Sequence, residues 1–412
     1  MPVLAQAQMF LKYAVIVSRH GVRSPTQTNE QLSQYAADPW PDWGVAPGEL
    51  TAHGRDLMKL FGSYDRASFA ARGLLPAAGC EAARQVVFYA DSGQRTLETA
   101  KALAEGMFPG CPPAIASGPA GQTDPLFNPI GAGAVHPDGA LAAAAILGRI
   151  GLNLGAVVDL YHSQFNEMAR VLAAPSKQAW LHAQSAVSGG NGDALADISG
   201  PLRTASTLSE VFLLEYANGM TGKDLAWGRL DVAGIRRLMP LHEAYADLAR
   251  RTPYIARARG SNLLSHILDS LQQAESGKPD AGALDKPGAA ALVIVGHDTN
   301  LSNLSGMMNI SWLLPGYEPN DPVPGGALVF ELWQDAASKR YTVRLSYTAQ
   351  SLEQMNRAAP LTNTAPPLRA PIFIPGCSTA ASDFECPFDD FRRAMLAAID
   401  PAFVPAPPSR AH

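Results

Sequence analysis

Three short apolar runs, rich in β-branched residues, stand out along the chain. They cover residues 13–19, 85–90 and 290–296. Each is too short for an ordinary helix and lacks alternation, so each predicts a strand that is covered on both faces. A helical pattern from about Thr96 to Phe108 follows the second run, and a strand followed by a helix predicts an α/β sheet with helices on its faces. Residues 327–333 and 341–347 alternate across a polar break and predict a β-hairpin.

The middle of the chain has a different pattern. From about residue 135 to residue 275 the apolar positions follow helical spacing, with polar loops expected at residues 189–192 and 278–285. We therefore predict a discontinuous α/β domain over residues 9–133 and 260–400, a helical insertion over residues 134–259, and a flexible tail over residues 401–412. The two clearest helical sets contain Leu208, Val211, Phe212, Glu215 and Tyr216, and Leu263, Leu264, Ile267, Leu268 and Leu271.

Composition excludes several classes of protein. Hydrophobic residues make up 47% of the 412 residues and charged residues 17%, which supplies a core and rules out global disorder. The net charge of −5 shows no excess of basic residues, which binding to nucleic acid or to an anionic membrane would favour. No run of 18 or more apolar residues occurs, so no transmembrane helix is expected.

The cysteines and the N-terminus bear on the cellular compartment. Cys80 and Cys111 form one local group, and Cys377 and Cys386 form another. Three pairings are possible; pairing of neighbours is the simplest and fits an exported protein, whereas four buried thiols would fit a cytosolic enzyme. Residues 1–8 fit the stub of a removed signal peptide, or an ordinary frayed terminus.

Two of the predicted strands end in a histidine. The first leads into Arg19-His20-Gly21-Val22-Arg23, and the third leads into His297-Asp298-Thr299-Asn300. The second strand also ends in a polar loop, which carries Asp91 and Arg95. Ligands of α/β sheets bind beyond the carboxyl ends of the strands, so these loops are expected to meet there.

The first of these loops suggests phosphoryl transfer. Each guanidinium of Arg19 and Arg23 is a fork of donors that matches phosphate oxygens. The two cations should lower the pKa of His20 and keep its imidazole neutral and nucleophilic. Asp298 is the natural candidate for the acid that protonates the leaving oxygen. Because no histidines share the spacing of a metal site, we predict no metal and no cofactor.

The same residues resemble a known family. The segment from Arg19 to Pro25 is similar to the signature of the histidine acid phosphatases, and His297-Asp298 resembles their second motif. Further segments resemble the bacterial periplasmic phytase branch, from about residue 13 to residue 390; these are residues 50–54, 125–129, 210–214, 227–229 and 324–326, with both cysteine pairs.

The resemblance implies a fold, an activity and a set of site residues. The implied fold is a phosphoglycerate-mutase-like mixed sheet with flanking helices, plus a smaller all-α insertion that covers the active site. The implied enzyme is a periplasmic or secreted monomer that hydrolyses phosphate esters, above all phytate, through a phosphohistidine. Its residues would be the nucleophile His20, the proton donor Asp298, the phosphate ligands Arg19, Arg23, Arg95 and His297, and the pocket residues Thr26, Gln27, Asp91, Glu210, Arg259 and Thr299.

The sequence departs from the family pattern at two positions, and several alternative functions remain open. Many enteric phytases carry Lys where this chain has Gln27, and Met where it has Thr207, so the pocket has one cation fewer for a highly phosphorylated substrate. A glucose-1-phosphatase or a broad-specificity acid phosphatase is therefore an alternative, as are a phosphoglycerate-mutase-like transferase and an inactive phosphate-binding protein. Singly, Arg19 and Arg23 could be surface residues, His297 a core histidine, and Arg95 a surface partner of Glu98 or Glu81.

Overall fold

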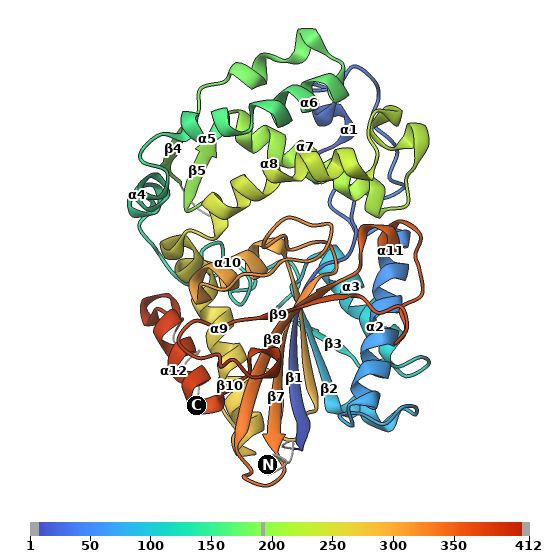
Figure 1. The fold of residues 1–412 in the computed structure, drawn as a ribbon, viewed down its shortest axis with the longest axis vertical. Helices are drawn as coiled ribbons and strands as arrows, with labels where there is room; N and C mark the ends of the chain where they lie inside the picture. The colour runs from blue at the N-terminus through green and yellow to red at the C-terminus, as the bar shows by residue number, and fades with distance from the viewer. Residues whose placement is uncertain (1–7, 191–193, 406–412) are drawn as a thin grey trace, which may run out of the picture.

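Within residues 8–190 and 194–405, which the computed structural model describes, eight strands form one mixed sheet in the lower part of Figure 1. The strand order is β10-β8-β7-β1-β6-β2-β3, and β9 also pairs with β8. The strands are β1 (Met9–Arg19), β2 (Val86–Ala90), β3 (Ile115–Ser117), β6 (Ala291–Gly296), β7 (Ala327–Asp335), β8 (Tyr341–Ala349), β9 (Leu368–Ile372) and β10 (Cys386–Pro387).

The three apolar runs are confirmed as strands, and they are neighbours. β6 lies between β1 and β2 and pairs with both in parallel, while β7 and β8 form the predicted antiparallel hairpin. β1 begins at Met9, four residues before the apolar run, because its first residues continue the ladder with β7 as far as Asp335. Phe10 and Lys12 in that extension are exposed, so apolar content alone does not reveal it.

Alternate residues of β1 pack on opposite faces of the sheet. Tyr13, Val15 and Val17 belong to the core on one face, and Ala14 and Ile16 belong to the core on the other. The first face is covered by α9 (Pro253–Ser276), α10 (Asp298–Met308) and α12 (Phe388–Ala398), and the second by α2 (Ala52–Ala71) and α3 (Gln94–Met107) (Figure 1). This two-sided cover explains why the strands read as continuous apolar runs.

A separate helical layer lies over the carboxyl ends of β1 and β6, in the upper part of Figure 1. Its core contains the apolar side chains of the long helices α7 and α8, including Leu208, Phe212 and Leu238. The helices of this layer are α4 (Gly139–Arg149), α5 (Leu154–Leu160), α6 (His162–Leu172), α7 (Pro201–Ala217) and α8 (Val232–Arg250), with the short α1 (Asn29–Leu32) and α11 (Leu352–Asn356) also in contact with its core.

Three expectations need correction or stay open. The loop expected at residues 189–192 belongs in part to a hairpin of β4 (Ala186–Gly189) and β5 (Ala196–Ser199), whose short strands lack an apolar pattern. The tail expected to be flexible from residue 401 begins with a turn in which Phe403 is buried against Tyr254, while residues 1–7 and 406–412 lie outside the described part of the chain. The predicted boundary between residues 259 and 260 falls within α9, and the domain division stays a prediction.

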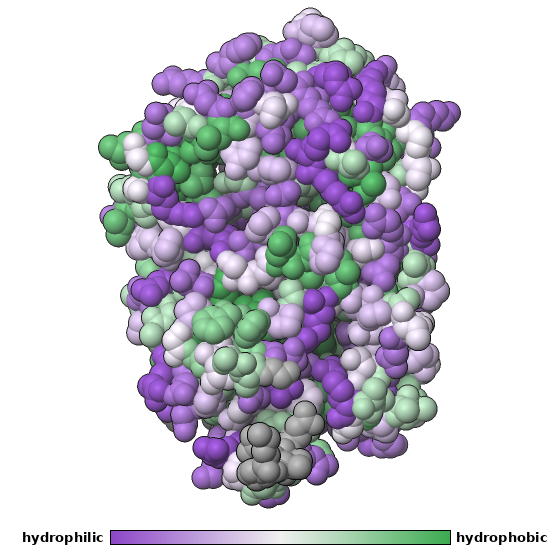
Figure 2. Space-filling model, viewed as in Figure 1, coloured by the Kyte–Doolittle hydropathy of each residue, from purple (hydrophilic) through white to green (hydrophobic). Residues whose placement is uncertain are grey.

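The surface on the side shown in Figure 2 is mixed, with apolar residues gathered in separate groups between hydrophilic ones. Among the described residues, no single helix is long and apolar enough to span a membrane. α4 and α5 meet both criteria only when they are counted together, and the pair is bent by 47° at the break between them.

Both disulfides join neighbouring cysteines, as the simplest pairing predicted. Cys80 is bonded to Cys111 and Cys377 to Cys386. The first bridge closes a segment with a sequence separation of 31, which contains β2 and α3, and the second closes a separation of 9.

We expect the two disulfides to stabilise the protein unequally. In the loop-entropy model the loss of Cys80–Cys111 should lower the free energy of unfolding by about 3–4 kcal/mol, and the loss of Cys377–Cys386 by about 2–3 kcal/mol. Denaturant unfolding of the two double Cys→Ser variants measures both. A greater loss from the second pair would show that strain or local packing, and not loop length, governs their effect.

Candidate active site

His20 lies where β1 leaves the sheet, next to the turn that follows β6. Its backbone N–H donates to the carbonyl of Gly296 at 2.9 Å, which continues the pairing of Arg19 with Gly296. The rings of His20 and His297 meet edge to face with centroids 5.6 Å apart. The two histidine-bearing loops therefore come together as the sequence predicts.

The surroundings of the His20 ring keep it neutral and fix its orientation. Burial lowers the pKa of His20 well below its ordinary value, and the positive charges of Arg19, Arg23 and Arg95 lower it further. The Nδ1 atom lies 2.9 Å from the carbonyl oxygen of Gly21. A carbonyl can only accept, so Nδ1 carries the proton and Nε2 keeps a free lone pair.

Arg19 and Arg23 hold a carboxylate in this structure. The two oxygens of Glu210, from α7, are shared between them: Oε1 pairs with Arg19, and Oε2 lies 3.1 Å from Nη2 of Arg23. Burial opposes the charge of Glu210, but Arg23 and Arg19 lower its pKa to about 2. Because a carboxylate occupies these donors, the pair of arginines is built to bind an oxyanion.

Arg95, His297 and Asp91 form a chain of hydrogen bonds. Nη2 of Arg95 lies 3.3 Å from Nδ1 of His297, and Nε2 of His297 lies 2.6 Å from Oδ2 of Asp91. A guanidinium can only donate, so Nδ1 accepts and Nε2–H donates to Asp91. Burial opposes ionisation of Asp91, but the hydrogen bond from His297 lowers its pKa. Arg95 therefore faces the site, and Glu98, its proposed surface partner, pairs with Arg55 and Lys101 instead.

Donors remain unmatched around this pocket. The Nε atoms of Arg19, Arg23 and Arg95 are buried and have no hydrogen-bond partner within the described parts of the chain. Buried donors of this kind are normally matched, and a tetrahedral oxyanion with several acceptor oxygens would match them.

Asp298 is the first residue of α10, and its partner was not expected from sequence. Nη1 of Arg250, the last residue of α8, donates to Oδ2 of Asp298 at 2.6 Å, and the backbone N–H of Thr299 donates to Oδ1 at 2.8 Å. Burial disfavours the charge of Asp298, but Arg250 and then Arg19 hold its pKa well below the ordinary value. The sequence shows only two arginines at a helix end, Arg250 and Arg251, without indicating which one faces the pocket.

Two cavities border the site, one at Asp298 and the other at His297. One of about 290 Å³ is lined by Thr26, Gln27, Thr207, Arg250 and Asp298, with Glu210 also on its wall. The other, of about 500 Å³, is lined by Asp91, Arg95, Arg259, His297 and Thr299. Every residue expected to line a substrate pocket therefore borders one of these cavities.

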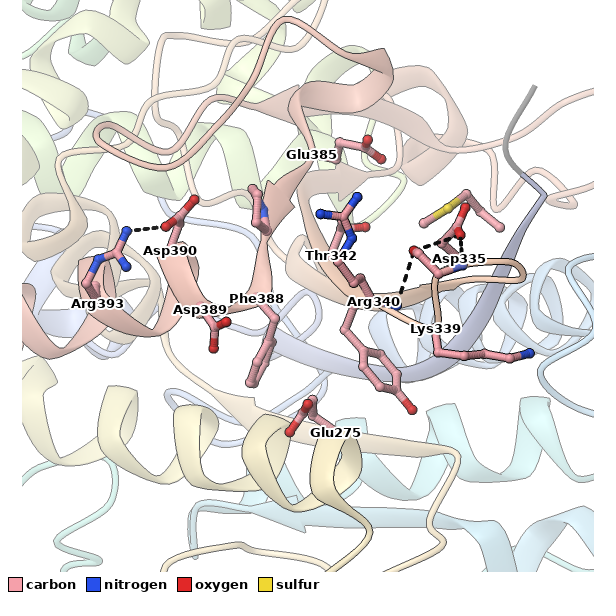
Figure 3. Close-up of a pocket in the computed structure, with 14 residues that line it drawn as sticks. Glu275, Asp335, Lys339, Arg340, Thr342, Glu385, Phe388, Asp389, Asp390 and Arg393 are labelled. Carbon is pink, nitrogen blue, oxygen red and sulfur yellow. Dashed lines mark hydrogen bonds and ion pairs between the residues drawn. The ribbon is translucent and has the colours of Figure 1, made fainter. Parts of the chain in front are cut away.

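A larger cavity of about 830 Å³ lies at the opposite end of the sheet (Figure 3). Met9, Asp335 and Tyr341 line it, and they stand at the ends of β1, β7 and β8 that are remote from His20. Its charged residues include Asp390 and Arg393, which pair with each other. It contains no histidine and no convergent set of arginines, so it offers none of the chemistry described above.

One group of side chains in the described structure could hold a metal ion by distance alone. Glu210, His242 and Asp298 offer ligand atoms within 4.8 Å of one another. Glu210 is already paired with Arg19 and Arg23, and Asp298 is paired with Arg250. The paired arginines repel a divalent cation, so this group of side chains does not fit a metal ion.

Comparison with known proteins gives consistent matches over most of the chain. A family model for the histidine phosphatase superfamily (branch 2) matches residues 10–348. Phytase AppA of Escherichia coli is 34% identical over 97% of this chain and 94% of that protein. The glucose-1-phosphatase of Salmonella typhimurium is 29% identical over 93% of this chain and 92% of that protein.

Solved structures give the same result. The Hafnia alvei phytase in complex with tartrate superposes with a TM-score of 0.90 at 35% identity, covering 98% of this chain and all of that one. The same phytase in complex with myo-inositol hexakis sulphate gives a TM-score of 0.88. The predicted fold class is confirmed by these matches.

Replacing Glu210 by Gln should strengthen the binding of inorganic phosphate. Glu210 has a folded pKa of about 2, below its ordinary 4.5, so its stabilising charge is present above pH 4.5 and is lost only as the pH falls through about 2. At pH 5 the carboxylate therefore competes with phosphate for Arg19 and Arg23. Titration calorimetry with inorganic phosphate should show a gain on the order of tenfold, which corresponds to one charged hydrogen bond of about 1.5 kcal/mol.

The matched control is Glu105→Gln, which removes a surface carboxylate from Arg55. It should leave phosphate binding unchanged. Weaker phosphate binding by the Glu210 variant would mean that the carboxylate positions the arginines and does not compete for them.

Proposed function

The chain belongs to the histidine phosphatase superfamily (branch 2), and from this premise we propose that it hydrolyses phosphate monoesters at acid pH, with phytate as its main substrate. One observation carries the proposal. A buried, neutral imidazole is surrounded by three arginines whose donors suit an oxyanion, and a carboxyl group that could serve as the acid lies beside the second histidine.

The proposed reaction has two steps. The phosphate group displaces Glu210 and binds to Arg19, Arg23 and Arg95. The Nε2 lone pair of His20 then attacks phosphorus, the bond from phosphorus to the ester oxygen breaks, and Asp298 gives its proton to the departing alcohol. In the second step water attacks the phosphohistidine, Asp298 takes back a proton, and inorganic phosphate leaves with the histidine free again.

The charges in the pocket suit this cycle to acid solution. His20 must be neutral to attack, and its pKa well below the ordinary value keeps it neutral at acid pH. Asp298 must carry a proton, which Arg250 and Arg19 oppose in the empty site. The phosphate groups of a bound substrate offset these cations and raise the pKa of Asp298, so we expect optimal activity between about pH 3.5 and 6.

Phytate is favoured over a sugar phosphate by the cationic cavities. Arg250 and Arg203 line the cavity at Asp298, and Arg259 lines the cavity at His297. Phosphates next to the scissile one would meet these cations, whereas glucose 1-phosphate has none to offer. Glucose-1-phosphatase remains the second candidate, because position 27 is Gln and the Salmonella typhimurium glucose-1-phosphatase is similar over nearly the whole chain.

The decisive experiment compares turnover of phytate, glucose 1-phosphate and p-nitrophenyl phosphate at several pH values. The proposal expects phytate to give the highest kcat/KM. Good turnover of glucose 1-phosphate without turnover of phytate would assign the sugar-phosphatase function instead.

We also propose that the enzyme is periplasmic or secreted and acts as a monomer after removal of a signal peptide. The two disulfides support an oxidising compartment, since such bonds seldom persist in the cytosol. All of the proposed chemistry comes from one copy of the chain.

His20→Ala should abolish hydrolysis of every substrate, because His297, the other imidazole at the arginines in the described pocket, has both ring nitrogens engaged by Arg95 and Asp91. Phosphohistidine breaks down on acid treatment. We therefore expect the wild-type enzyme to yield an acid-labile phosphoenzyme after rapid quench with labelled substrate. The alanine variant should yield none. Retention of more than a trace of turnover by the variant is incompatible with the covalent mechanism.

Asp298→Asn should distinguish substrates by their leaving groups. Loss of a general acid costs about 10²–10⁴ in rate where the leaving group needs protonation. We therefore expect kcat/KM for phytate to fall by roughly that factor, while p-nitrophenyl phosphate, whose phenolate leaves unaided, loses far less. Equal losses on both substrates would indicate that Asp298 binds substrate and does not supply the proton.

A further inference from the structure

Arg250 makes an ion pair that conflicts with the proposed role of its partner. Its Nη1 atom lies 2.6 Å from Oδ2 of Asp298, and the two side chains are only 19% and 13% exposed. A carboxylate held so closely by a cation stays ionised, yet a general acid must carry a proton. Something must therefore remove Arg250 from Asp298 during the reaction.

Arg250 lacks the structural hydrogen bonds that its neighbour Arg251 makes. Arg251 donates to Asp247, to the hydroxyl of Ser305 and to the carbonyl of Ile310, and so ties α8 to α10. The only hydrogen bond from the Arg250 side chain that the described structure contains goes to Asp298. Arg250 also lines the cavity of about 290 Å³ that opens beside Gln27, and its remaining donors can serve a ligand there.

Other charges around Asp298 do not perform the same task. Arg19 and Arg95 face it from β1 and α3, but the scissile phosphate itself would occupy both. The imidazoles of His20 and His242 are buried, and burial lowers the pKa of each. The neighbouring carboxyl groups are those of Glu210, Glu243 and Asp321, which favour protonation of Asp298 and do not hold it ionised. Among the described residues, Arg250 is thus the one nearby cation that a single scissile phosphate leaves paired with Asp298.

We propose that Arg250 is a specificity-determining residue, which releases Asp298 as the acid only when a second phosphate group of the substrate takes its guanidinium. The inference deepens the proposed phytase function and rests on it. In this exchange Arg250 leaves Asp298 for the second phosphate, and Asp298 takes up a proton from solvent. When the bond from phosphorus to the ester oxygen breaks, that proton passes to the departing oxygen. A monophosphate offers no second anion, so Asp298 stays paired and ionised.

The absence of a cation at position 27 makes Arg250 the residue suited to this contact. Gln27 lies on the same cavity wall and accepts only a long hydrogen bond from Thr26, at 3.4 Å. Arg203 borders the cavity as well, but it is more than half exposed and is paired with Asp197. Neither residue has a hydrogen bond or ion pair with Asp298 in the described structure, so of these three residues Arg250 is the one that couples substrate charge to the acid.

The test compares Arg250→Gln with the wild type on phytate, glycerol 2-phosphate and p-nitrophenyl phosphate. We expect kcat/KM for glycerol 2-phosphate to rise, because Asp298 no longer has to part from a cation, and kcat/KM for phytate to fall. Each change should be on the order of tenfold, the effect of one charged contact. p-Nitrophenyl phosphate should change least. The basic limb of the pH profile for glycerol 2-phosphate should move to higher pH, since loss of the cation raises the pKa of Asp298.

Three further variants keep the test decisive. Arg237→Gln is the matched control, the same substitution on an exposed ion pair of the same helix, and should leave all three substrates unchanged. Arg250→Lys, which keeps the charge, should retain most of the preference for phytate if the Gln variant proves unstable in thermal unfolding. Gln27→Lys combined with Arg250→Gln should recover the KM for phytate but keep the raised activity on glycerol 2-phosphate.

The outcomes separate the inference from the proposed function. Wild-type enzyme that does not hydrolyse phytate would overturn the proposed function itself. If the wild type hydrolyses phytate but Arg250→Gln alters phytate and glycerol 2-phosphate by the same factor, or leaves the pH profile in place, Arg250 has no role in specificity and the inference is wrong.

Discussion

The parallel pairing of β1 with β6 is the contact from which the site is built. It sets Arg19 opposite Gly296, so that the turns carrying His20 and His297 leave the sheet side by side. Core packing on both faces of β1 holds that register, since a slip of one residue would turn Val15 and Val17 out of their core. The loops can therefore hold reactive groups at fixed distances although loops are ordinarily the mobile part of a fold.

Charge balance is the second constraint on this pocket. Arg19, Arg23, Arg95 and Arg250 converge on a small, largely buried space, and in the empty site protein groups compensate them: Glu210 for two of them, Asp298 for Arg250, and the His297–Asp91 pair beside Arg95. In the proposed reaction a substrate phosphate therefore replaces the Glu210 carboxylate at these arginines. The affinity for phosphate is then the difference between how strongly the arginines bind phosphate and how strongly they bind the Glu210 carboxylate. This competition also helps inorganic phosphate to leave at the end of the cycle.

The two layers of the fold divide these tasks. The sheet, the loops at its carboxyl end and the start of α3 supply His20, three arginines and His297, while the helical layer supplies Glu210 from α7 and Arg250 from α8. Substitutions in α7 and α8 can therefore change which phosphate esters are accepted without altering the nucleophile. This arrangement agrees with the similarity of the chain both to phytases and to a glucose-1-phosphatase.

The strands at residues 13–19, 85–90 and 290–296 and the polar loops at their ends could be predicted from the sequence, because apolar runs and glycine turns are local features. The sequence favoured the pairing of neighbouring cysteines but left other pairings open until the structure showed both bonds. It did not reveal the extension of β1 to Met9, the β4–β5 hairpin or the burial of Phe403, all of which depend on partners distant in the chain. Two features of the site became visible only in the folded chain: Glu210 bridges Arg19 and Arg23, and Arg250, not Arg251, faces Asp298. A helix of known sequence can rotate about its axis, and packing against another layer alone fixes which of two adjacent side chains points into the pocket.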